Sequence, residues 1–193
     1  NIEFRSTLGN HDIAKPVGIS IADYVALTND KYALKNNPIV SDKKAILSVD
    51  YIYDYGFYHK DLKGLMKETP LPMDSLLKLT NERIFSDQDI RFEHLEDIIE
   101  EQTKHLTEMV EKYKDKELIF VSHYMPKEEF VADNVQQDKR LAFKNAFMGS
   151  NKIGEALEEL GFSACYFGHT HRRVGGLING IHYYCNPIGT EHD

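Results

Sequence analysis

Hydrophobic residues recur at three- and four-residue steps between residues 89 and 114, with acids and lysines at the intervening positions. This spacing places the apolar side chains on one face and predicts a long amphipathic helix over 89–114. The run Glu117–Val121 that follows is apolar but too short for a helix, so it predicts a buried strand. The apolar positions of the predicted helix are Leu95, Ile98, Ile99, Leu106, Met109, Val110 and Tyr113.

The rest of the chain alternates between shorter elements of both kinds. Strands are predicted over 45–49 and 163–167, and a helix over 151–160 that closes with Gly161 as a left-handed cap. Two further strands, 174–178 and 181–185, flank Asn179-Gly180, a strong hairpin signal. Weaker patterns suggest a strand over 2–8 and helices within 19–34 and 138–148. Helices that alternate with strands before a closing hairpin favour a layered α/β architecture with mixed sheets.

Composition narrows the class of protein. The 193 residues are 41% hydrophobic and 28% charged, which fits one domain over residues 1–193. No run of about 20 apolar residues is present, so the sequence excludes a membrane-spanning protein and predicts no signal peptide. With only two cysteines, Cys165 and Cys185, we expect buried thiols in a protein of the reducing cytoplasm.

The charge balance is acidic: 31 Asp and Glu against 23 Lys and Arg give a net charge of −8. A broad nucleic-acid surface needs clustered basic residues, so this balance argues against one. It leaves room for a small anionic substrate, because a bound metal ion reverses the local field.

Three short segments each place histidine in a tight turn directly after a predicted strand. They are Gly9-Asn10-His11-Asp12, Ser122-His123 and Gly168-His169-Thr170-His171. Turns at strand ends converge on one rim of a sheet, so these side chains are candidates for a common site. Imidazole and amide groups suit Zn, Mn or Fe better than Ca. In an extended His-Thr-His turn the two histidines point apart, which suits two neighbouring ions rather than one.

The order of these motifs resembles the calcineurin-like metallophosphoesterase superfamily, of the bacterial small-phosphoesterase type. The ending, Asn179-Gly180 followed by Asn186-Pro187-Ile188-Gly189, is similar to that family's closing hairpin and turn. The resemblance implies a four-layer sandwich of two mixed β-sheets flanked by helices. It also implies hydrolysis of a phosphomono- or phosphodiester by metal-activated hydroxide, with histidine as general acid, at a centre of two divalent ions (Mn, Fe or Zn).

The roles that the resemblance implies can be assigned residue by residue. Asn10, His123 and His169 would ligate one metal ion and His171 the other. His11 would be the general acid and would contact the phosphate together with Asn10, while Asp12 would orient His11. Arg172 is a weaker candidate for binding the substrate phosphate.

The chain departs from the family pattern in its first residues. The family has further metal-binding motifs upstream of Gly-Asn-His-Asp, and here the first eight residues contain neither Asp nor His. We therefore expect a domain that lacks its N-terminal part. The alternative function is a catalytically degenerate domain of the same fold that binds a metal or a partner. Oligomeric state and physiological substrate stay open.

The segment 50–90 is a candidate insert that shapes the cleft. Its first part is dense in aromatic residues, from Tyr51 to Tyr58, and two interpretations apply. The rings could line the substrate cleft, or they could pack in the core, which we favour. In the first case Tyr53 and Tyr55 would affect substrate binding, and in the second only stability.

Overall fold

The computed structural model describes residues 4–9, 31–51, 53–58, 95–131 and 145–188. Within these ranges the chain forms six strands, two α-helices and two short 3₁₀ helices. The elements are β1 (Ile39–Val40), β2 (Lys44–Leu47), η1 (Gly56–Tyr58), α5 (Leu95–Lys112), β3 (Glu117–Val121), η3 (Glu128–Phe130), α7 (Asn151–Glu159), β4 (Ala164–Tyr166), β5 (Val174–Ile178) and β6 (Ile181–Cys185).

The six strands form one mixed sheet in the order β1-β2-β3-β4-β6-β5. The four central strands β2, β3, β4 and β6 are parallel, and β1 and β5 close the two edges as antiparallel strands. The carboxyl ends of parallel strands meet at one edge of a sheet, so the turns after β2, β3, β4 and β6 lie there together.

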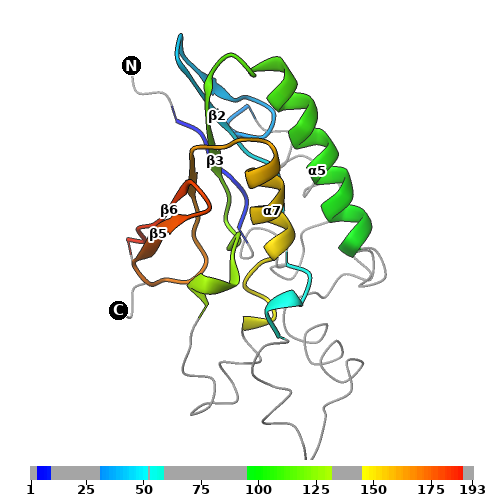
Figure 1. Ribbon diagram of the computed structural model, residues 1–193, viewed down its shortest axis with the longest axis vertical. Helices are drawn as coiled ribbons and strands as arrows, with labels where there is room; N and C mark the ends of the chain where they lie inside the picture. The colour runs from blue at the N-terminus through cyan, green and yellow to red at the C-terminus, as the bar shows by residue number, and fades with distance from the viewer. Residues whose placement is uncertain (1–3, 10–30, 52, 59–94, 132–144, 189–193) are drawn as a thin grey trace, which may run out of the picture.

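One face of the sheet is buried beneath the helices. Leu47, Phe120, Cys165 and Tyr183 are register partners in one row across the four parallel strands, and each is 0% exposed. Helices α5 and α7 lie side by side over this face (Figure 1). Their buried apolar residues join the same core cluster, which explains why the helix periodicity in the sequence is so clear. These residues are Ile99, Leu106, Met109, Val110, Ile153 and Leu157.

The opposite face of the sheet is apolar but less covered. One row across it is Val121, Tyr166 and Tyr184, in which both tyrosines are more than 40% exposed. The two tyrosine rings stack on each other at 5.0 Å. Leu177, on the edge strand β5, is 62% exposed.

Most of the predicted elements are confirmed. Strand 117–121 and both hairpin strands have the predicted bounds, and Asn179 and Gly180 both have positive φ, as the hairpin signal requires. Gly161 has φ 76° and directly follows the C-cap Leu160, so it is the predicted left-handed residue that ends α7. Helix α5 is described from Leu95 onwards, and residues 89–94 lie outside the described ranges.

The fold class is confirmed as mixed α/β, but other expectations differ from what is found. The described residues contain a single six-stranded sheet, not the two sheets of a four-layer sandwich. The expected strand over 2–8 amounts to one isolated parallel bridge between Ser6 and Ala33 in the described part of that segment. Most of the segments 19–34 and 138–148 fall outside the described residues.

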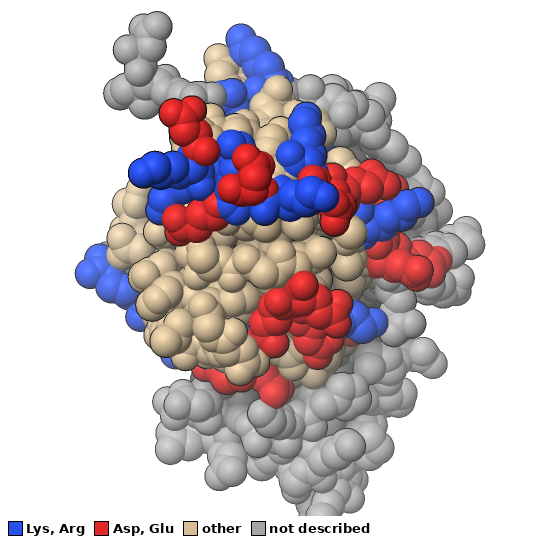
Figure 2. All heavy atoms as spheres, turned by 45° about the horizontal axis from the view of Figure 1, so that its top comes forward, with Lys and Arg blue, Asp and Glu red and all other residues tan. Residues whose placement is uncertain are grey.

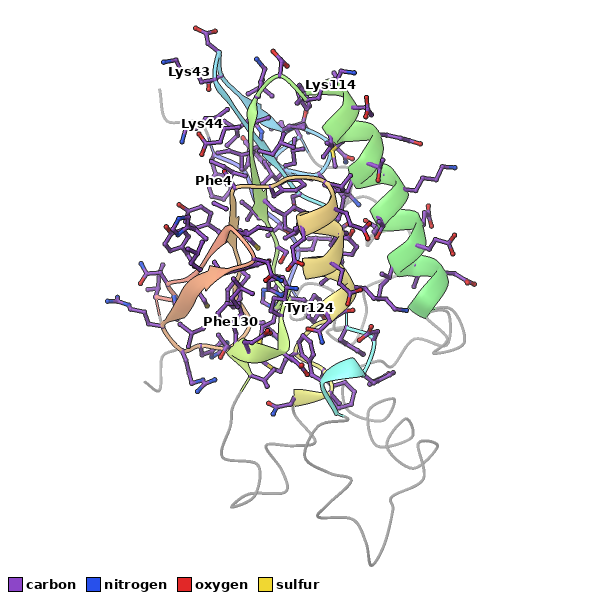
Figure 3. All side chains as sticks on the ribbon, viewed as in Figure 1. Phe4, Lys43, Lys44, Lys114, Tyr124 and Phe130 are labelled. Atoms are coloured by element: carbon purple, nitrogen blue, oxygen red, sulfur yellow. The ribbon has the colours of Figure 1, made fainter. Side chains whose placement is uncertain are left out.

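The two ends of the sheet differ in chemistry. Figure 2 shows lysines and acids of mixed sign in a band around the amino ends of the strands, where Lys44 pairs with Glu117 at 3.0 Å. Figure 3 shows Lys43 and Lys114 at this end and Tyr124 and Phe130 at the other. Since the lysines of the band have acidic neighbours, this face offers no broad basic surface. Among the described residues, no helix combines the length and apolar character needed to cross a membrane.

Candidate functional site

The turn after β3 places His123 at the carboxyl edge of the sheet. Strand β3 buries Leu118 and Phe120 against the helices, and the chain then leaves the sheet at Ser122. The Ser122 hydroxyl donates a 2.6 Å hydrogen bond to the carbonyl of Tyr124, which closes a tight turn around His123. His123 is half-buried.

The turn after β4 brings His169 to the same place. The Gly168 amide donates to the carbonyl of His123 at 3.0 Å, so the two turns are joined through their backbones. As a result Nε2 of His123 lies 3.1 Å from Nδ1 of His169. The prediction that these two motifs converge is confirmed for this pair.

The backbone of the His-Thr-His turn is not extended. His169 and His171 have φ of 69° and 53°, in the left-handed region that few residues other than glycine adopt. We expected an extended turn, in which successive side chains point to opposite sides, and this geometry was wrong. The environments of His169 and His171 nevertheless differ. His169 is half-buried against His123, whereas His171 is exposed. Backbone strain of this kind is frequent at functional sites.

The first histidine motif begins beside the same pair. A Cβ atom on Gly9 would lie 2.9 Å from both Cε1 and Nδ1 of His123, so a larger residue here would displace the His123 ring. Asn10, His11 and Asp12 lie outside the described residues. The position of Gly9 nevertheless indicates that the motif starts within contact of His123.

An aromatic floor supports the two imidazoles. The Tyr124 ring contacts both of them, with centroid distances of 5.3 Å to His123 and 5.0 Å to His169. Tyr53 in turn packs against Tyr124, with the two ring centroids 5.8 Å apart. Burial raises the pKa of Tyr53 and of Tyr55, so both phenols stay protonated and neutral. Tyr51, Tyr53, Tyr55 and Phe57 are thus buried in the core beneath the site, as favoured from the sequence, and residues 59–90 lie outside the described ranges.

Arg172 is held by protein groups. Its Nε donates to the Thr170 hydroxyl at 3.3 Å, and its Nη2 donates to the Phe130 carbonyl at 3.1 Å. The guanidinium therefore ties the histidine turn to η3. No hydrogen bond or ion pair links His171 to His123 or His169 in the described part of the chain.

The His123–His169 pair fits one metal ion. Two imidazole nitrogens at about 2.0–2.1 Å from a tetrahedral ion lie ~3.3 Å apart, close to the observed 3.1 Å. Nε2 of His169 is also 3.1 Å from the carbonyl oxygen of Phe147, which orients the ring as partners of metal-bound histidines do. Within the described ranges there is no group of three or more His, Cys, Asp or Glu residues that could hold a metal.

Two elements of this site were not predicted from the sequence. The carbonyl of Phe147 has no side-chain signature, because any residue supplies a carbonyl. Tyr124 directly follows His123, and its place under both rings depends on how the turns meet. The only sequence signal for this role of Tyr124 was that an aromatic residue directly follows His123.

The fold and the site together define a mixed α/β protein with paired histidines at the carboxyl edge of a parallel sheet. A solved structure with a similar fold is the crystal structure of phosphopantetheinyl hydrolase (PptH) from Mycobacterium tuberculosis. The TM-score is 0.66 at 14% sequence identity, and the match covers 96% of this chain and 69% of that one. No family model matches the chain, and no curated protein matches its sequence.

These comparisons correct the family assignment. The sequence motifs resemble the calcineurin-like metallophosphoesterase superfamily, but no model of that family matches the chain. What the comparisons support is a likeness in fold to a phosphopantetheinyl hydrolase. Short motifs shared in order do not by themselves establish a family.

Proposed function

We propose that this protein is a metal-dependent hydrolase of phosphoesters. The observation that carries the proposal is the contact between Nε2 of His123 and Nδ1 of His169 at 3.1 Å, at the carboxyl edge of the sheet. Ligand sites of open α/β sheets lie at this edge. Gly9, which begins the third histidine-bearing motif of the sequence, also lies against His123.

His123 and His169 would hold one metal ion, and Asn10, which directly follows Gly9, would complete its ligands. His171 would contribute to a second ion, so the proposed cofactor is a pair of divalent ions (Mn, Fe or Zn). When bound, such ions supply Lewis-acid activation of water and of the phosphoryl group. The aromatic side chains under the imidazoles, Tyr124 and Tyr53, are neutral, so they do not compete with the histidines for the cations.

The remaining roles concern proton transfer and substrate binding. His11 would protonate the leaving oxygen, and Asp12 would hold its ring in position. Arg172 has two nitrogens bonded to the protein, which fixes its guanidinium and leaves Nη1 for an oxygen of the substrate phosphate.

The likeness in fold suggests a substrate class. The similar structure is named a phosphopantetheinyl hydrolase, so a phosphopantetheinyl ester is a reasoned first candidate beside simpler phosphomono- and diesters. The four-layer arrangement with a second sheet also stays part of this proposal. Its support is the apolar outer face with Tyr166 and Tyr184, because parallel sheets are normally covered on both sides.

The test is metal binding and hydrolysis measured on the same protein, with His123→Ala as the variant. We expect Mn²⁺-dependent turnover of bis-p-nitrophenyl phosphate or p-nitrophenyl phosphate, and a loss of both binding and turnover by orders of magnitude in His123→Ala. His182→Ala is the matched control, because His182 is an exposed histidine on β6 and should leave both unchanged. Unchanged turnover in His123→Ala would contradict the proposal. Metal binding without turnover would instead favour a degenerate binding domain.

A further inference from the structure

We propose that the main-chain carbonyl of Phe147 fixes the tautomer of His169, and that Gly149 is the positioning residue that makes this possible. The inference deepens the proposed function, because it names what selects the metal-binding nitrogen of His169. It concerns a hydrogen bond within the protein, so it can be tested without turnover.

The tautomer follows from the partners of the two ring nitrogens. A carbonyl oxygen only accepts hydrogen bonds, so Nε2 of His169, 3.1 Å from the Phe147 oxygen, carries the proton. In the neutral ring Nδ1 of His169 then has the lone pair. It lies 3.1 Å from Nε2 of His123, so without a metal it accepts a hydrogen bond from the N–H of that nitrogen. Nδ1 of His169 is thus the nitrogen available to a metal ion.

The segment that contains Phe147 is clamped to the turn after His123. Met125 donates from its amide to the carbonyl of Met148 at 2.8 Å, and its own carbonyl accepts from the Ser150 amide at 3.1 Å. The Phe147 ring is wedged edge-on against Tyr53 and Tyr55, at centroid distances of 5.2 and 5.3 Å. Backbone and side chain therefore hold the carbonyl in one place.

Gly149 allows the two segments to approach this closely. A Cβ atom at this position would lie 1.9 Å from the Met125 oxygen and 2.8 Å from the Met125 nitrogen. Both atoms belong to the backbone, so no side-chain rotation relieves the clash. A residue other than glycine must move the 145–150 segment, and the Phe147 carbonyl moves with it.

The first experiment is ¹⁵N NMR of the histidine rings in the metal-free wild-type protein, with His169 assigned by comparison with His169→Gln. We expect a neutral ring protonated at Nε2, with slow exchange of that proton. A ring protonated at Nδ1, or a rapidly averaging mixture, would overturn the inference. This measurement uses the metal-free wild-type protein, so it does not depend on whether a variant of Gly149 folds.

The second experiment compares Gly149→Ala with Gly176→Ala, whose added Cβ meets nothing within 4 Å. In Gly149→Ala we expect the Nε2 proton to lose its protection and Mn²⁺ or Zn²⁺ binding to weaken by about 10- to 100-fold. Gly176→Ala should match the wild type in both readouts. Wild-type protection and metal affinity in a folded Gly149→Ala would overturn the role of Gly149. If that variant does not fold, the wild-type spectrum still decides the tautomer.

The two proposals fail separately. A protein that hydrolyses no phosphoester but shows the Nε2 tautomer would contradict only the proposed function. An active enzyme with the opposite tautomer would contradict only this inference.

Discussion

At the scale of single residues, the site depends on close backbone approaches more than on the histidines alone. His123 is contacted by the backbones of Gly9 and Gly168, with a Cβ on Gly168 placed 3.5 Å from its Nδ1. The unfavourable φ falls on His169 and His171 rather than on the neighbouring glycine. The positions of the rings therefore depend on the backbone at Gly9 as well as on the turns after β3 and β4.

Tyr53 gives the sharpest single-residue prediction. Its ring is 2% exposed and contacts Tyr55, Tyr124 and Phe147. We expect Tyr53→Ala to lower the free energy of unfolding by about 3–5 kcal/mol, measured by urea denaturation. Tyr53→Phe keeps the ring and should cost only ~1 kcal/mol. A Tyr53→Ala protein of normal stability but altered KM would contradict this packing role and would indicate that Tyr53 lines the substrate cleft.

The sequence predicted the candidate residues but not all of their contacts. His123 and His169 were identifiable because each directly follows an apolar strand. The left-handed backbone at His169 was not identifiable, because a histidine in the sequence does not indicate a positive φ. The contact of the Phe147 carbonyl with His169 was not identifiable either, because it depends on the pairing of Met125 with the segment 145–150, which is distant in the sequence.

At the scale of elements, a partly buried ion pair joins α7 to Lys127, which directly precedes η3. Lys127 Nζ lies 2.5 Å from Glu158 Oε1, with the lysine side chain only 9% exposed. Burial alone would raise the pKa of Glu158, but hydrogen bonds from Lys127 and Asn179 outweigh it and hold the pKa below its ordinary value. A Cβ on Gly154 would lie 2.4 Å from the Lys127 side chain, so α7 is shaped to admit it.

This pair predicts a pH-dependent contribution to stability. Because the folded pKa of Glu158 is lowered, its contribution is complete above the ordinary glutamate pKa of 4.5 and is lost as the pH falls through the lower folded value. We expect Glu158→Gln to reduce the free energy of unfolding by about 1–3 kcal/mol at pH 7, and by much less at low pH.

Denaturation curves at a series of pH values provide the measurement. Glu111→Gln is the matched control, because its pair with Lys114 is on the surface and should contribute less than ~0.5 kcal/mol. A difference between wild type and Glu158→Gln that stays constant with pH would show that the charge of Glu158 is not the cause.

Element prediction succeeded where local signals were strong. The hairpin β5–β6 and strand β3 have the predicted bounds, since Asn179-Gly180 and the apolar run 117–121 are local signals. The two-residue strand β1 was not predicted, because it is a strand only through its pairing with β2. The helical turns η1 and η3 are also too short for a periodic pattern.

At the scale of the whole molecule, the core is rich in buried phenols. Burial raises the pKa of Tyr51 to about 12, against a smaller lowering by its hydrogen bond to Thr103. It also raises the pKa of Tyr53, Tyr55 and Tyr183. An acid whose folded pKa is raised is more easily ionised in the unfolded chain, so stability must fall as the pH rises above the ordinary tyrosine value of 10.0.

The alkaline titration should therefore occur in two steps. We expect the buried phenols of Tyr51, Tyr53, Tyr55 and Tyr183 to ionise only in the later step, together with unfolding. Ultraviolet absorbance of phenolate and far-ultraviolet circular dichroism, recorded on one sample, check this. Full ionisation of all tyrosines while the circular dichroism stays native would contradict the packing described here.

The topology of the sheet also sets the order in which the molecule can assemble. The hairpin β5–β6 is local and can form within about 1–10 μs. The pairing of β2 with β3 joins Lys44 to Glu117, about seventy residues along the chain, so its closure is slow in comparison. His123 and His169 belong to turns after β3 and β4, which meet only when these strands are paired. During refolding, metal binding should therefore be among the last properties to return, after most of the secondary structure.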